Sequence, residues 1–144
     1  DLSVASRSDW TVEDSALAAG NRIYLRSLGD LKLNDVELST SEQVRLEALM
    51  NLSVNSARFS SGLKEVMMRA ATIDLSNIDF PSATTVNMQT LKGGIEGKYA
   101  TFVPGNRAYG PVNFLKNISH GGNPIMDRPS FDQHGTKINI TKLP

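Results

Sequence analysis

Two histidines and the acids beside them are the residues whose types could support catalysis or metal binding. His120 and His134 lie near Asp127 and Asp132, and imidazole and carboxylate groups bind transition metals. Ser119, His120 and Asp127 have the residue types of a hydrolytic triad. Neither set has the spacing of a helical metal motif or the turn that surrounds a catalytic serine. We therefore expect solvated loop histidines, with no metal, no cofactor and no catalytic residue.

Carboxylates on an outward strand face could act instead as the acid and base of a polysaccharide-cleaving enzyme. The acids predicted to face outward are Glu37, Asp74 and Asp79, interleaved with Lys32 and Arg58. The aromatic side chains that could stack on sugar rings are Tyr24, Tyr99, Tyr109 and Phe102. Interleaved charges are typical of a solvated face. A glycan-binding or glycan-cleaving module is therefore our alternative hypothesis, and a non-enzymatic protein is the main prediction.

The overall composition argues against several classes of partner. The chain of 144 residues has 15 Lys and Arg against 15 Asp and Glu, so it lacks the basic excess that nucleic acids and anionic membranes reward. Cysteine is absent, which excludes disulfides and thiolate chemistry. The chain contains no long apolar run, so we do not expect it to insert into a membrane. The chain opens at Asp1 in strand-like alternation, so we expect a mature product or an excised fragment.

The elements that must position these residues come from an internal repeat. LKLNDVELST at 31–40 and IDLSNIDFPS at 73–82 share one order of apolar and polar residues. Copies begin about 21 residues apart along the chain. Aligned, they form six apolar columns, of which the first two are Leu2, Ile23, Val44, Val66, Val86 and Val4, Leu25, Leu46, Met68, Met88. Apolar residues at i and i+2 predict strands with one buried face.

The repeat predicts an all-β fold, a right-handed parallel β-helix (β-solenoid) with about 21 residues and three short strands per coil. Two outward columns support this register, because their charges alternate in sign between coils: Arg26, Glu47, Arg69 and Glu37, Arg58, Asp79. Polar pairs such as Asn34-Asp35 recur at one corner. They predict turns and a ladder of stacked side chains.

The rhythm of the repeat ends after Gly94. We predict solenoid coils over residues 1–94 and an irregular C-terminal layer of the same domain over 95–144. In that layer we expect strands at 112–118 and 137–143, with Val112, Phe114 and either Leu115 or Ile118 facing inward. Such a layer would act as a cap that covers the apolar end of the stack.

The tail GPVNFLKNISHGGNPI followed by INITKLP resembles the C-terminal region of large exported bacterial repeat proteins of the verrucomicrobial type, some of which carry a FecR-type domain upstream. The resemblance covers roughly residues 66–144 and concerns structural motifs. It implies export, a cell-surface or extracellular setting and a repetitive architecture, and it supplies no catalytic residues.

The first coil has no cap in the sequence, so we expect an open edge that can pair with another chain. The residues of this predicted self-association edge are Leu2, Val4, Trp10, Val12 and Leu17. The main functional prediction is a structural segment or subunit of an exported bacterial surface or fibre-forming assembly, associating end to end. The expected partner is a second copy, stacked head to tail into an oligomer or fibre, or upstream solenoid of the same protein. A glycan is the candidate ligand of the alternative.

Overall fold

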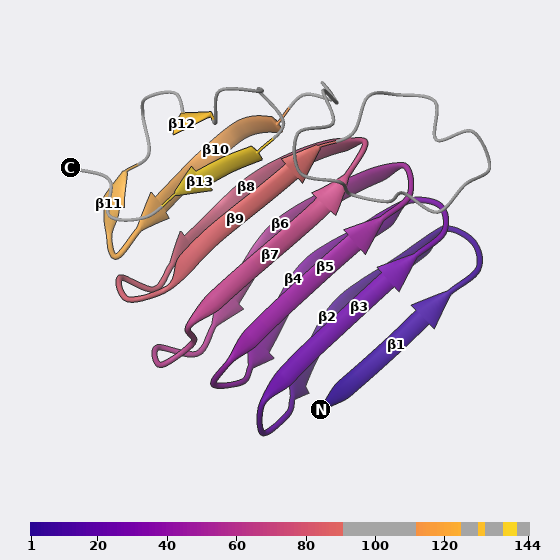
Figure 1. Ribbon diagram of the computed structural model, residues 1–144, viewed down its shortest axis with the longest axis horizontal. Coiled ribbons are helices and arrows are strands. Elements are labelled where there is room, and N and C mark those ends of the chain that lie inside the picture. Colours follow the sequence, from indigo (N-terminus) through magenta and orange to yellow (C-terminus); the bar gives the residue numbers. More distant parts are fainter. Residues whose placement is uncertain (91–111, 125–129, 132–136, 141–144) are drawn as a thin grey trace.

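The protein is a stack of β-strands in two layers (Figure 1). Its structure, a computed structural model, describes residues 1–90, 112–124, 130–131 and 137–140. All regular secondary structure within these ranges is β-strand. In Figure 1 the short strands form one layer, the long strands lie behind them, and β1 stands at the opposite end of the stack from β10 and β13.

One sheet contains seven strands and the other contains six. The seven-stranded sheet has the order β1 (Leu2–Ser6), β3 (Arg22–Ser27), β5 (Gln43–Ala48), β7 (Glu65–Ala70), β9 (Thr85–Thr90), β13 (Lys137–Ile140) and β12 (Ser130–Phe131). The six-stranded sheet has the order β11 (Asn123–Pro124), β10 (Val112–His120), β8 (Thr72–Phe80), β6 (Asn51–Phe59), β4 (Leu31–Ser39) and β2 (Trp10–Ala18).

The strands pair in parallel with the register that the repeat predicts. Ile23 pairs with Leu2 on one side and with Val44 on the other, and Val44 pairs with Val66. The same holds in the second sheet, where Leu31 lies between Trp10 and Leu52. Each step of about 21 residues therefore adds one strand to each sheet. This confirms the all-β parallel β-solenoid.

Each coil has two strands, where the sequence predicted three short ones. The second and third predicted segments form one nine-residue strand that bends at a residue with positive φ: Asp14, Asp35, Ser56, Asn77 and Asn117. In β4 the residues before the bend (Leu31, Leu33) and after it (Val36, Leu38) are all buried. The bend thus shifts the phase of alternation by one residue and keeps both arms facing the core.

The core is the set of inward columns between the sheets. Ile23, Val44, Val66 and Val86 form one column, and none of them is accessible to solvent. Phe59 and Phe80 stack in another, with ring centroids 5.7 Å apart. Burial of each such side chain contributes about 1.5–3 kcal/mol before the cost of ordering the chain. No coil can bury its columns alone, so the stability of each coil depends on its neighbours.

The outward columns also align as predicted. Glu47 pairs in register with Arg26 and Arg69, and Glu37 pairs with Arg58. At the bend, the side chains of Ser76 and Asn77 both donate hydrogen bonds to Asn55 Oδ1, at 3.0 and 2.9 Å. Asn117 Nδ2 donates to Asn77 Oδ1 at 3.0 Å. The polar corner is therefore a side-chain ladder that supports the positive-φ turns.

The C-terminal strands add one further layer to the stack. β10 pairs in parallel with β8, whereas β13 runs antiparallel to β9. Of the two candidates for the inward position, Ile118 is buried and Leu115 is 65% exposed. Leu115 is excluded from the core because β10 has a bulge between Phe114 and Lys116. The predicted boundary between the regular coils and the C-terminal layer, at residues 94 and 95, lies outside the described residues. The right-handed sense of the solenoid stays a prediction.

Candidate functional site

The N-terminal edge, formed by β1 and β2, is where the predicted self-association residues lie. These two strands are outermost in their sheets. Val4 is 39% exposed, Leu2, Trp10 and Leu17 are half-buried against the core, and Val12 is buried. In the next coil the aligned residues Leu25, Leu31 and Leu38 are fully buried. The difference arises because the first coil has a neighbour on one side only among the described residues.

A second column, which the sequence analysis missed, begins at this edge and lies at the corner just before each long strand. We call it the corner ladder, and it consists of Asp9, Asp30, Asn51 and Thr72. The Asp30 amide donates to Asp9 Oδ1 at 2.8 Å. The backbone amide and the side-chain Nδ2 of Asn51 both donate to Asp30 Oδ1, at 3.1 and 3.0 Å. Thr72 Oγ1 continues the ladder to Asn51 Oδ1. The spacing of these residues, one per coil, was a signal that the sequence offered.

A substitution at Gly29 can test whether the corner ladder stabilises the fold. A Cβ at Gly29 would overlap Asp9 Oδ1 and would lie 3.0 Å from the Asp9 amide nitrogen. Gly29→Ala should displace the Asp9 carboxylate and lower the free energy of unfolding by about 1–2 kcal/mol, measured by urea denaturation. Gly20→Ala is the matched control, since no heavy atom lies within 4 Å of its added Cβ. It should be neutral, or stabilising by about 0.4–1 kcal/mol. Equal stability of the two variants would contradict a supporting role for Asp9.

The outward face of the seven-stranded sheet carries the Glu47 cluster: Tyr24, Arg26, Arg45, Glu47 and Arg69. Glu47 is only 5% exposed. Its carboxylate accepts hydrogen bonds from Tyr24 Oη at 2.7 Å and from Arg45 Nε at 2.6 Å. Arg26 and Arg69 lie within 4.0 and 3.8 Å of it. The Arg45 guanidinium also lies 5.0 Å from the centre of the Tyr24 ring.

Burial is the largest cause of the pKa shifts of two members of this cluster, Tyr24 and Arg69. Burial, and then the hydrogen bond to Glu47, raises the pKa of Tyr24 above its usual value. Burial, and then repulsion from Arg45, lowers the pKa of Arg69. The raised pKa keeps Tyr24 neutral near pH 7, so its hydroxyl can donate to Glu47. The cluster therefore centres three guanidinium groups, from three adjacent strands, on one buried carboxylate.

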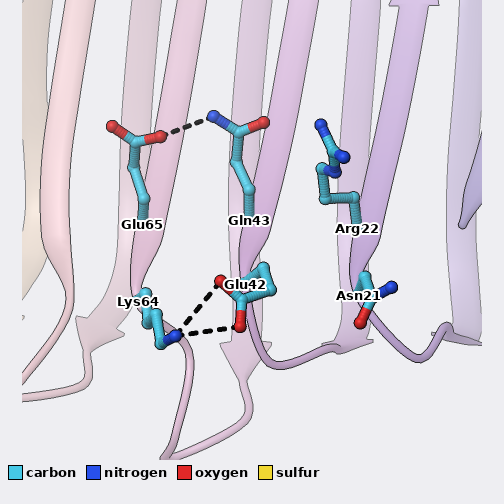
Figure 2. A pocket seen from close by; sticks show the side chains of 6 residues that line it. All are labelled: Asn21, Arg22, Glu42, Gln43, Lys64 and Glu65. Carbon is cyan, nitrogen blue, oxygen red and sulfur yellow. Dashed lines mark hydrogen bonds and ion pairs between the residues drawn. The ribbon is translucent and has the colours of Figure 1, made fainter.

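A groove of about 550 Å³ lies beside the cluster, at the start of strands β3, β5 and β7 (Figure 2). It is lined by Asn21, Arg22, Glu42, Gln43, Lys64 and Glu65. Figure 2 shows that most of these side chains are engaged with one another. Lys64 Nζ contacts both oxygens of Glu42, at 2.9 and 3.2 Å, and Gln43 donates to Glu65. Both groove carboxylates thus have protein partners.

The outward acids named from the sequence lie on β4 and β8. Asp74 and Asp79 lie on β8, on the two sides of its bend at Asn77. Asp79 Oδ1 accepts hydrogen bonds from Ser119 Oγ at 2.8 Å and from the Gly122 amide at 3.0 Å. Glu37 aligns with Arg58, whose guanidinium pairs with Asp35 at 3.1 Å. Asp79 and Arg58 therefore have partners within the protein, and Lys32 is exposed.

The expectation of a solvated loop histidine is wrong for His120. It ends β10, pairs in register with Phe80 and is 5% exposed, so it continues the inward column of Phe59 and Phe80. Its Nε2 lies 2.9 Å from the Thr84 carbonyl oxygen. Its i+2 spacing from Ile118 was the available signal. His134, Asp127, Asp132, Tyr99, Phe102 and Tyr109 lie outside the described residues.

No group of three or more His, Asp or Glu that could hold a metal is found among the described residues. No helix in that part of the chain is long and apolar enough to span a membrane. Comparison of the chain with protein-family models, curated proteins and solved structures finds no match.

Proposed function

We propose that this chain is a non-enzymatic structural module that associates end to end with another solenoid coil through its N-terminal edge. The observation that carries the proposal is the incomplete burial of the first coil. Trp10 remains half-buried, whereas its counterparts Leu31 and Leu52, which each face two neighbours, are fully buried. Outer strand edges with apolar rows template the addition of a further strand.

We further propose that this module belongs to an exported bacterial surface or fibre-forming assembly, the setting that the resemblance of the tail implies. In such an assembly a module would associate by the packing of its strands and would catalyse no reaction. The zero net charge and the stacked apolar columns of this chain suit that role. The second copy and the upstream solenoid remain the two sources of a neighbouring coil.

The glycan alternative has one supporting observation, the polar groove beside Tyr24. Grooves with amide, carboxylate and guanidinium groups offer the hydrogen bonds that sugar hydroxyls need. However, Tyr24 is engaged with both Glu47 and Arg45. The open edge therefore supports the structural proposal better than the groove supports the alternative.

The proposed role of the N-terminal edge can be tested by fusing one additional coil to the N-terminus of the chain. In this test a second copy of residues 22–42 is fused directly before Asp1. The copy has the length of one coil, so the added Leu31 stands 21 residues before Trp10 and should pair with it in register, as Leu31 itself does on the other side of Trp10. Trp10 is the only tryptophan of the chain, and its emission reports burial of the edge directly. We expect a blue shift of this emission and a rise of several degrees in melting temperature.

The control carries Leu33→Asp in the added copy only, which puts a charge into the inward column of the new coil. This variant should show the melting temperature and Trp10 emission of the unfused chain. If the intact and the charged copy give the same emission and the same melting temperature, the edge does not accept a coil and the proposed function fails.

A further inference from the structure

We propose that the partner of the N-terminal edge is a parallel solenoid coil with Asp or Asn at the corner aligned with Asp9, whose side chain accepts a hydrogen bond from the Asp9 amide. This inference rests on the proposed function and names its partner. The corner ladder, the aligned bends and the sequence of the last layer each support it.

The corner ladder is directional. In each described step the side-chain oxygen belongs to the coil nearer the N-terminus, and the donor belongs to the following coil. Asp9 begins the ladder, and its own amide has no hydrogen-bond partner among the described residues. The edge therefore presents a donor at the position where Asp30 and Asn51 each donate to a carboxylate of the preceding coil. A preceding coil with an acceptor here would extend the ladder by one step.

The geometry of such a contact already exists inside the chain. Asp9 accepts the hydrogen bond of the Asp30 amide, and the residue before Asp30 is Gly29, which has no Cβ. Asp30 accepts the hydrogen bond of the Asn51 amide in the same way, although the residue before Asn51 is Met50, which carries a side chain. Ser8 occupies the corresponding position at the edge. An incoming Asp or Asn can therefore approach Asp9 in the way that Asp30 approaches Asn51. No new backbone geometry is required.

The bend in β2 restricts the orientation of the partner. β2 bends at Asp14, and in the contacts of β2, β4, β6 and β8 with one another the bends of neighbouring strands coincide, because the strands are parallel and in register. An antiparallel strand would match the bend only at a twofold axis and would reverse the ladder. Shape and hydrogen-bond direction thus both favour a parallel coil.

A second copy, stacked head to tail, fits less well. Its last layer offers β10, which begins at Val112 in register with Ile73, and the residue that precedes Val112 in the sequence is Pro111. Proline has no side-chain oxygen, so the residue that precedes this strand in the sequence cannot accept a hydrogen bond from the Asp9 amide through its side chain. The partner is therefore a coil of the regular kind, such as the one that residues 22–42 form, and not the C-terminal layer of this chain.

The experiment varies only the corner residue of the added coil. In the fusion described above, Asp30→Asn in the added copy should keep the rise in melting temperature, because Asn Oδ1 also accepts. Asp30→Ala in the added copy should lower the melting temperature by roughly 3 °C, the usual consequence of removing one side-chain cap from a chain of this size. Lys32→Ala in the added copy, at an exposed position, is the matched control and should change nothing.

The outcomes separate the two proposals. If the Ala, Asn and Asp versions melt together while Trp10 is buried in all three, stacking stands and the corner requirement is overturned. If no version buries Trp10, the proposed function fails. Negative-stain microscopy of the unfused chain over a concentration series adds a second test. We expect dispersed particles, and filaments of uniform width would overturn the inference by showing that the C-terminal layer is accepted as a partner.

Discussion

Leu31→Asp is expected to prevent folding of the chain. Leu31 lies in an inward column between Trp10 and Leu52 and has no exposed surface. The substitution removes a buried side chain worth about 2–5 kcal/mol and leaves a carboxylate in the core at a cost of several kcal/mol more. Their sum approaches the whole stability of an ordinary domain, about 5–15 kcal/mol. Circular dichroism and urea titration should show no cooperative unfolding transition.

The matched control is Lys32→Asp, which introduces the same side chain one residue later on the same strand. Lys32 is exposed, and its neighbours in register are Thr11 and Ser53. This variant should unfold within about 0.5 kcal/mol of the parent. A cooperative transition of normal midpoint for Leu31→Asp would mean that the apolar columns do not hold the coils together, and the solenoid itself would be in doubt.

The columns could be predicted because parallel stacking repeats one environment in every coil. Val44 meets Ile23 on one side and Val66 on the other, so the same kind of residue returns after each coil. The polar corner returns for the same reason, since each coil needs a residue that tolerates positive φ at the bend. The number of strands was harder to predict. A bend inside a continuous strand and a break between two strands leave the same alternation in the sequence.

Features that occur once could not be predicted in this way. His120 is polar, yet it closes an inward column, because the Thr84 carbonyl oxygen lies within hydrogen-bond distance. Leu115 is apolar, yet a bulge turns it outward. Glu47 was expected in an outward column, and only its contacts show that it is a buried carboxylate. In each case local contacts or a local irregularity of the strand decide the outcome, and no column of equivalent residues records them.

Glu47→Ala is the second substitution with a large expected effect. The Glu47 carboxylate is the shared counter-ion of Arg45, Arg26 and Arg69. Its loss removes the acceptor of Tyr24 Oη and leaves guanidinium groups from three adjacent strands close together. Removal of one partner from a buried ion pair costs about 3–5 kcal/mol, so we expect a loss of that size in the free energy of unfolding. Chemical denaturation of the purified variant measures it.

Three further measurements separate this effect from ordinary truncation. Glu42→Ala removes an ion pair with Lys64 in which both side chains are largely exposed, and it should cost no more than about 1 kcal/mol. Added salt should stabilise Glu47→Ala more than the parent, because it screens repulsion among the arginines. Arg45→Met in the Glu47→Ala background should recover part of the loss, and a double-mutant cycle gives the coupling energy. If Glu47→Ala costs no more than Glu42→Ala and responds to salt in the same way, the cluster is a surface charge pattern and does not brace the strands of the sheet.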